Sequence, residues 1–156
     1  MDEAAFLILS SLNLPVDDIA PWLDCRLTQP ERTSLRDLIE ARVATRKPAA
    51  YLTRTAWIQR FKFYVDERAI VPRSYIGELL LRDGLASLIG EPGAISNVLD
   101  LCTGSGCLAI LAAYIFPNAA IAASDISEDA LDVARINVAT YELQDRITLI
   151  RSDLFD

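Results

Sequence analysis

The chain has 156 residues, of which 52% are hydrophobic and 24% are charged, and its formal net charge is −7. This composition is typical of a packed globular protein and excludes a disordered chain. The longest apolar run, Leu108 to Phe116, is far shorter than the roughly 20 residues that cross a bilayer. The first residues also lack the basic region of a secretory signal. We therefore expect a cytoplasmic protein with no membrane contact.

Histidine is absent and there are three cysteines, Cys25, Cys102 and Cys107. The cysteines have no metal-ligand spacing, so the sequence predicts no metal site, and their small odd number favours a reducing compartment. Without histidine, no imidazole can act as a general base.

The N-terminal part has helical periodicity. Apolar residues predict a first helix over 3–13 and a short second one over 16–23. A third helix is expected to begin near Pro30, which suits a first helical turn, and to continue to about Lys47, where Pro48 stops it. We expect residues 1–50 to form a small helical domain.

Three short strands are expected next, over 56–58, 61–65 and 69–71, as a hairpin linker that spans residues 51–73. Ser74 is a candidate cap for a helix that runs to about Leu88. Residues 90–93, which include two glycines and a proline, then lead into a sheet.

The most informative segment is residues 97–107. A short apolar strand leads to Asp100, Gly104 and Gly106 predict a tight turn, and an apolar helix follows. Strand, glycine turn and helix form the usual architecture of a nucleotide-type cofactor site. Residues 104–109 also satisfy the loose G-x-G-x-x-A dinucleotide pattern, which alone is weak evidence.

Two further strands are expected to end in carboxylates. A strand over 119–123 leads to Asp125, which lies 19 residues after Gly106, near the ~20-residue interval of a ribose-binding acidic residue. Alternatively, Asp125 only begins the next helix, for which Ser127 is a candidate cap. A third strand over 147–150 is followed by Asp153. Because the carboxyl ends of parallel strands line one crevice, we expect Asp100, Asp125 and Asp153 to share a small-molecule site.

Acidic groups around the glycine turn would oppose a pyrophosphate but suit the cationic, phosphate-free S-adenosylmethionine. Residues 100–106, Asp-Leu-Cys-Thr-Gly-Ser-Gly, resemble motif I of class I S-adenosylmethionine-dependent methyltransferases. Residues 48–53, 63–68 and 71–74 resemble the protein glutamine-amide methyltransferase family. Within that family, the sequence Asp-Glu-Arg followed by Val-Pro-Arg-Ser resembles the motif of the branch that acts on the third protein of the large ribosomal subunit. It differs from the motif of the release-factor branch.

The resemblance implies an α/β fold: the helical domain, the hairpin linker, and the first half of a doubly wound, Rossmann-like sheet over residues 74–156. It also implies a cofactor site for S-adenosyl-L-methionine. Its expected residues are Asp100, Cys102, Thr103, Gly104, Ser105 and Gly106 near the methionine end, Asp125 and Ile126 at the ribose, Asp153 and Leu154 at the adenine, and Ile70 over the pocket. Arg73 is expected at the substrate side, the alternative being a surface arginine that flanks a helix.

The family's catalytic motif, Asn-Pro-Pro-Tyr, orients the glutamine amide and so works by positioning. These 156 residues contain no Asn-Pro dipeptide. We therefore expect the chain to be an N-terminal portion of a methyltransferase, with no catalytic residue of its own and no activity alone.

Charge is uneven along the sequence. Residues 26–82 carry a net charge of +6 and residues 97–156 a net charge of −6. The basic segment suggests contact with ribosomal RNA, but a solvated helix and hairpin surface is the simpler explanation, since acidic residues are interspersed among the basic ones. Self-association through the open edge of the first sheet strand is a further expectation. Two other functions stay open: a nicotinamide-dependent oxidoreductase, and a non-enzymatic module that binds a protein or the ribosome.

Overall fold

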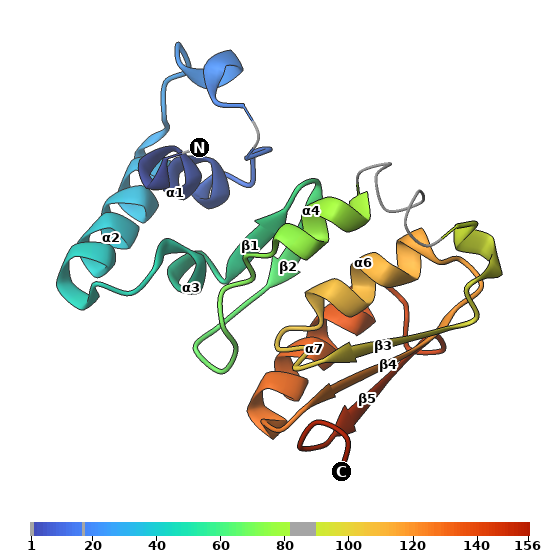
Figure 1. The fold of residues 1–156 in the computed structure, drawn as a ribbon. Coiled ribbons are helices and arrows are strands. Elements are labelled where there is room, and N and C mark those ends of the chain that lie inside the picture. Colours follow the sequence, from blue (N-terminus) through green and yellow to red (C-terminus); the bar gives the residue numbers. More distant parts are fainter. Residues whose placement is uncertain (1, 17, 82–89) are drawn as a thin grey trace. The chain divides into compact units, whose positions relative to one another are not determined.

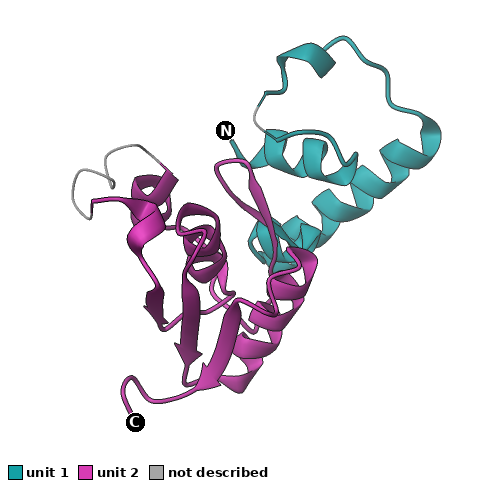
Figure 2. Ribbon diagram, turned by 90° about the vertical axis from the view of Figure 1, so that its right-hand side faces the viewer, with its two compact units in different colours: residues 1–55 teal, residues 56–156 magenta. Residues whose placement is uncertain are grey.

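The computed structural model describes residues 2–16, 18–81 and 90–156. The chain divides into two compact units, residues 1–55 and residues 56–156, which Figure 2 distinguishes by colour. Most of the segment expected as a linker, from Ala56 onward, belongs to the second unit. The helices and strands are labelled in Figure 1.

The first unit is helical, as the periodicity predicts. Its elements are α1 (Glu3–Ser11), the 3-10 turn η1 (Ala20–Trp22), α2 (Gln29–Thr45) and α3 (Ala49–Thr53). Asp2 caps α1 by accepting a hydrogen bond from the backbone N–H of Ala5 at 2.8 Å. Thr28 and Glu31 form a capping box at the start of α2, with Pro30 in its first turn. The first and third expected helices are therefore confirmed.

Two details of this unit differ from expectation. Only Ala20–Trp22 is helical in the expected second helix, because the Asp18 carboxylate accepts a hydrogen bond from the Ala20 N–H and forms a local turn instead; position 17 lies outside the described residues. Pro48 both follows α2 and occupies the N-cap of α3, a helix that was not predicted. A proline tolerated at a helix start can thus begin a second helix as well as end the first.

A hairpin follows, which belongs to the second unit except for its first residue, Thr55. It consists of β1 (Thr55–Ile58) and β2 (Phe61–Tyr64), joined through Gln59, whose φ is 51°. Phe61 and Phe63 are buried, and both rings contact the ring of Tyr141. The first two expected strands are therefore confirmed.

The third expected strand, over residues 69–71, is wrong. The Ala69 N–H donates to the Asp66 carbonyl in a turn, and Pro72, which has no N–H, follows at once. These residues run as an extended loop to α4 (Tyr75–Leu81).

Helix α4 begins where it was expected, with the Ser74 hydroxyl accepting from the Gly77 N–H at 3.3 Å. The expected continuation to Leu88 lies outside the described residues beyond position 81. Gly77 allows α4 to pack closely, because a Cβ there would lie 3.0 Å from Ile58 Cγ2 and 3.2 Å from Leu111 Cδ1. The expected loop over residues 90–93 overlaps the 3-10 turn η2 (Pro92–Ala94).

Three parallel strands in the order β3-β4-β5 complete the unit and confirm the α/β fold class. They alternate with two helices: β3 (Asn97–Leu101), α6 (Cys107–Ile115), β4 (Ala120–Asp125), α7 (Glu128–Thr140) and β5 (Ile147–Arg151). In the described part of the chain, β3 has no strand partner other than β4.

The two faces of this sheet differ in burial. Val98, Ile121 and Ile147 are in register and pack in the main core with α6. The side chains at the neighbouring positions of each strand point to the opposite face of the sheet, and Leu99 on that face is 54% exposed. Both crossovers therefore place their helices over one face, as Figure 1 shows. In the described ranges, no helix is both long and apolar enough to span a membrane.

Candidate functional site

The turn after β3 is built from left-handed backbone. Cys102, Gly104 and Gly106 have φ values of 58°, 56° and 77°. The Thr103 N–H donates to the Ser124 carbonyl at 2.9 Å, which ties the turn to β4. A Cβ on Gly106 would lie 3.1 Å from the Ala134 Cβ, so glycine also permits the close approach of α7. The predicted glycine turn is therefore held against both its neighbouring strand and the next helix.

Asp100, on β3, lies beneath this turn, next to the start of α6. Its Oδ2 accepts hydrogen bonds from the Thr103 hydroxyl at 2.6 Å and from the Ala109 N–H at 3.1 Å. Burial raises the pKa of the Asp100 carboxyl, and the nearby Asp125 carboxylate raises it further, against the lowering effect of the two hydrogen bonds. A protein carboxyl group thus already occupies the N-terminus of α6, where a dinucleotide would place its pyrophosphate.

Asp125 joins the glycine turn to the start of α7. Its Oδ2 accepts from the Gly104 N–H at 2.8 Å and its Oδ1 from the Ser127 N–H at 3.0 Å. The Ser127 hydroxyl in turn caps α7 by accepting from the Ala130 N–H. Asp125 therefore does contact the beginning of the next helix, and each oxygen keeps a second acceptor position for another partner.

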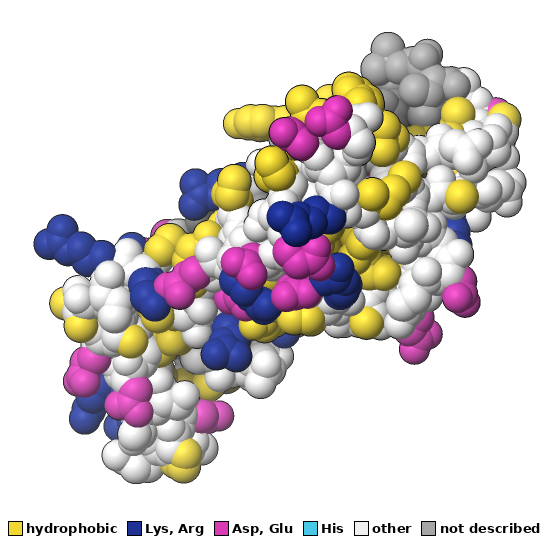
Figure 3. Space-filling view, turned by 90° about the horizontal axis from the view of Figure 1, so that it is seen from below, with side chains coloured by type: hydrophobic (Ala, Val, Ile, Leu, Met, Phe, Trp, Pro, Cys, Tyr) yellow, Lys and Arg dark blue, Asp and Glu magenta, His cyan; other side chains and the backbone are white. Residues whose placement is uncertain are grey.

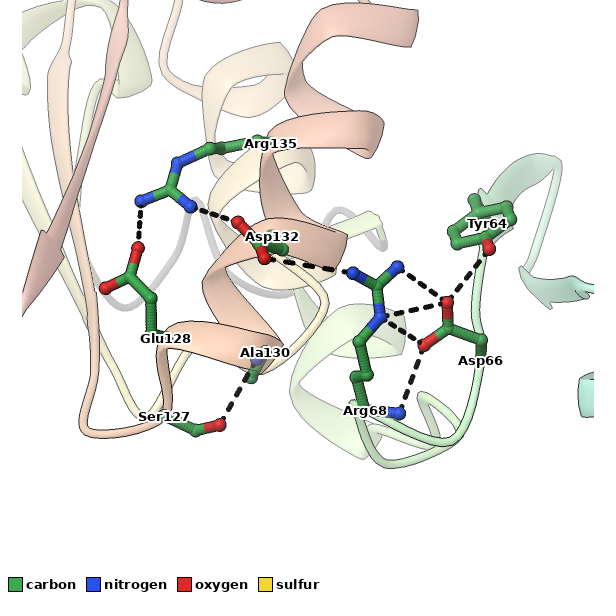
Figure 4. A network of polar contacts seen from close by, with 8 residues as sticks. All are labelled: Tyr64, Asp66, Arg68, Ser127, Glu128, Ala130, Asp132 and Arg135. Carbon is green, nitrogen blue, oxygen red and sulfur yellow. Dashed lines mark hydrogen bonds and ion pairs between the residues drawn. The ribbon is translucent and has the colours of Figure 1, made fainter.

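The loop after β2 forms a separate polar network, drawn in Figure 4. The Asp66 carboxylate accepts from the guanidinium and the backbone N–H of Arg68, and from the Tyr64 hydroxyl at 2.9 Å. These contacts, with the Arg68 guanidinium foremost, hold the pKa of Asp66 well below its usual range against the effect of burial. Arg68 Nη1 also lies 3.8 Å from Asp132 Oδ2 on α7, so the loop is tied to that helix by charge.

Between this loop and the glycine turn lies a cavity of about 540 Å³, a size typical of small-molecule sites. One wall is formed by residues 68–74 and the other by residues of the glycine turn and of the start of α7. Eight of the expected site residues line it: Ile70, Arg73, Cys102, Thr103, Gly104, Ser105, Asp125 and Ile126. The turn and the loop, which are distant in sequence, thus face a single cavity.

The other expected residues take different places. Asp100 and Gly106 are not among the residues that line the cavity, but they support the turn from below and beside it. Asp153 and Leu154 follow β5 outside that lining, and Leu154 is 54% exposed. The Asp125 carbonyl accepts from the Ser152 N–H at 3.1 Å, so this segment adjoins the site through the backbone.

Residues that the sequence reasoning did not identify also contribute to the site. Ser127 and Ala130 line the cavity, and Asp66 supports the loop. Asn137, with 1% exposure, bonds to both the glycine turn and β2. One signal was present: Asn137 is a polar residue on the apolar face of α7, the face that contains Ala130, Val133 and Ala134. In the described residues, no cluster of three candidate metal ligands occurs. The absence of a metal site from the protein stays a prediction.

Comparison with known proteins shows which proteins this chain is similar to. Residues 80–156 match the family model of the methyltransferase small domain. The chain is 54% identical over 99% of its length to a ribosomal protein uL3 glutamine methyltransferase of Burkholderia pseudomallei. The chain is thus similar to this relative along nearly its whole length. Similar relatives of the same name occur in Neisseria meningitidis (55% identity, 99% of this chain) and Bradyrhizobium diazoefficiens (56% identity, 98% of this chain).

The chain spans about half the length of these curated relatives: 50%, 51% and 50% respectively. Among solved structures, it is similar to the N-terminal domain of human METTL16 in complex with SAH, with a TM-score of 0.47 and 14% identity over 96% of this chain and 54% of that chain.

Proposed function

We propose that this chain supplies the cofactor-binding half of a methyltransferase that transfers a methyl group from S-adenosylmethionine to a glutamine side-chain amide of ribosomal protein uL3. The observation that carries the proposal is the 54–56% identity to uL3 glutamine methyltransferases, which extends over nearly the whole chain. Neither the oxidoreductase nor the non-enzymatic module finds support in these relatives.

The residues around the cavity fit S-adenosylmethionine better than a dinucleotide. Asp125 is held by two backbone N–H groups, so its remaining acceptor positions are pre-oriented for the two ribose hydroxyls. Asp100 bonds to the Ala109 N–H at the start of α6 and would repel a pyrophosphate there. The glycine turn brings backbone rather than side chains to the cavity, which suits a ligand that must approach closely.

When bound, the cofactor supplies an electrophilic methyl group. The residues of this chain contribute by binding and orienting it: Asp125 at the ribose, and the backbone of residues 102–105 along the methionine end. Because no histidine is present in these residues, the proposal assigns them no general base. We propose that a loop outside these 156 residues orients the acceptor amide, which is catalysis by positioning.

Titration of S-adenosylhomocysteine by calorimetry on the complete protein tests this assignment. Asp125→Ala is expected to weaken binding by about tenfold or more, because each charge-assisted hydrogen bond contributes about 1.5–3 kcal/mol. Asp129→Ala is the matched control, since Asp129 is an exposed carboxylate at the start of the same helix and does not line the cavity. Equal affinities for the wild type and Asp125→Ala would refute the ribose assignment, and tight binding of NAD would refute the cofactor.

Three finer expectations belong to the same proposal: a cytoplasmic location, contact of the basic segment 26–82 with ribosomal RNA, and self-association through β3. On the face shown in Figure 3, basic and acidic side chains are interspersed, which favours a modest RNA contact over a strong one. Filter binding with ribosomal RNA at two salt concentrations tests the contact with RNA. Light scattering tests self-association, for which the exposed Leu99 on β3 is the main argument.

A further inference from the structure

Helix α7 contacts both walls of the cavity. On the side of the glycine turn, its Ala134 lies against Gly106. On the side of the loop, Asp132 faces Arg68, while Ala69 packs in a small apolar cluster with Ala130 and Val133. The spacing between the two walls therefore depends on how each is attached to this one helix.

Asn137 makes a buried polar attachment to both sides. Its side-chain Nδ2 donates to the Ser105 carbonyl and to the Tyr64 carbonyl, each at 2.9 Å, and its Oδ1 accepts from the Tyr64 N–H at 2.7 Å. The reverse orientation of the amide would set Nδ2 against the Tyr64 N–H, donor against donor, so only this orientation satisfies all three partners. Both protons of the amide are thus used, within a residue that is 1% exposed.

The two partners of Asn137 lead directly to the two walls. Ser105 lies between the glycines of the turn and lines the cavity. Tyr64 ends β2, two residues before Asp66, whose carboxylate holds the loop through Arg68. Because buried hydrogen bonds are strong and costly to leave unpaired, this single side chain fixes the turn and the end of β2 in one geometry.

We propose that Asn137 is a positioning residue of the cofactor site, which holds the glycine turn and the strand that leads into the opposite wall at the spacing that the cofactor requires. The proposal rests on the proposed function. It assigns Asn137 no contact with the cofactor and no part in the chemical step.

Asn137→Asp in the complete protein tests the role with almost no change in shape. The variant keeps the acceptor for the Tyr64 N–H but turns an oxygen, instead of an amine, toward two carbonyl oxygens. We expect the Kd for S-adenosylhomocysteine, measured by calorimetry, to rise by about tenfold, the scale of one lost buried hydrogen bond. An unchanged Kd in the folded variant would overturn the proposal.

Two controls separate positioning from loss of stability. Asn118→Asp makes the same substitution at the opposite end of the sheet. Asn118 lies just before β4, and its side-chain amide donates to the Gly93 carbonyl. Val138→Ala removes buried volume from α7 next to Asn137 and lowers the unfolding temperature without touching either wall. Both are expected to keep the wild-type Kd, and a rise of similar size in Val138→Ala would show that stability alone is responsible.

Hydrogen exchange on the wild type tests the same coupling if the Asn137 variant fails to fold. S-adenosylhomocysteine is expected to slow exchange of the Tyr64 amide, which lies outside the cavity lining, more than exchange of the Ala120 amide, which bonds to Ser96 at the far end of the sheet. Equal slowing at both amides would overturn the proposal. A wild type that binds neither S-adenosylmethionine nor S-adenosylhomocysteine would overturn the proposed function itself.

Discussion

The two walls of the cavity are held in place by different kinds of interaction. The glycine turn rests on contacts that are buried or part-buried: Asp100 beneath it, Asp125 beside it and Asn137 behind it. The loop over residues 68–74 rests mainly on ion pairs near the surface and on one alanine, Ala69. Buried polar contacts fix a geometry strongly, whereas exposed ion pairs contribute little and are weakened by salt. The glycine turn is therefore the rigid wall of the cavity, and the loop is the adjustable one.

The largest expected effect concerns the rigid wall. Gly106→Ala is expected to lower the free energy of unfolding by about 2–3 kcal/mol, because a left-handed residue costs about 1–2 kcal/mol and the added Cβ crowds Ala134 at 3.1 Å. Gly104→Ala is the matched control: its φ is also positive, but a Cβ there meets nothing within 4 Å. Urea unfolding measures both. Equal losses would show that contact with α7 does not constrain the turn.

The pH dependence of stability is expected to have opposite signs at the two walls. The pKa of Asp100 is raised above its ordinary value of 3.8, so its contribution is fully present below pH 3.8 and is lost as the pH rises through the folded-state pKa. The pKa of Asp66 is lowered, so its contribution is present above pH 3.8 and is lost as the pH falls toward the folded-state pKa.

Asp100→Asn should therefore remove a loss of stability that the wild type shows above pH 3.8. Asp66→Asn should cost on the order of 1 kcal/mol at neutral pH and progressively less below pH 3.8, the ordinary pKa of an aspartate. Urea midpoints between pH 3 and pH 7 measure both effects. Curves of the same sign for the two variants would contradict the comparison.

The smallest expected effect concerns the link between the loop and α7. Asp132→Asn should lower stability by at most about 0.5 kcal/mol, since both ion pairs of Asp132, with Arg68 at 3.8 Å and with Arg135 on α7 itself, are partly exposed. Comparison of thermal unfolding at 0.05 M and 1 M sodium chloride should show that the difference from the wild type disappears in high salt. A loss that persists in 1 M salt would mean that the loop is held more rigidly than proposed.

The rigid wall was also the more predictable one. Glycines at a strand end and Asp125 at the ribose interval are local patterns, and the structure brings them to one cavity as expected. The loop wall depends on partners that are distant in sequence. Nothing in the sequence near Arg68 indicates that it faces Asp132. Residues 69–71 were predicted to form a strand because the apolar pattern gives no sign of the turn at Asp66. Asn137 was missed for the same reason, since its partners lie 32 and 73 residues away.

The two cysteines that flank the glycine turn differ in their reactivity toward thiol reagents. Burial raises the pKa of the Cys107 thiol to about 11, so at neutral pH this group is protonated and reacts slowly with alkylating reagents. Cys102, five residues earlier, is exposed and lines the cavity, and Cys25 is an exposed reference in the first unit. Cofactor bound in the cavity is therefore expected to lower the ratio of Cys102 to Cys25 labelling by a maleimide, a measurement that needs no fluorophore or substitution.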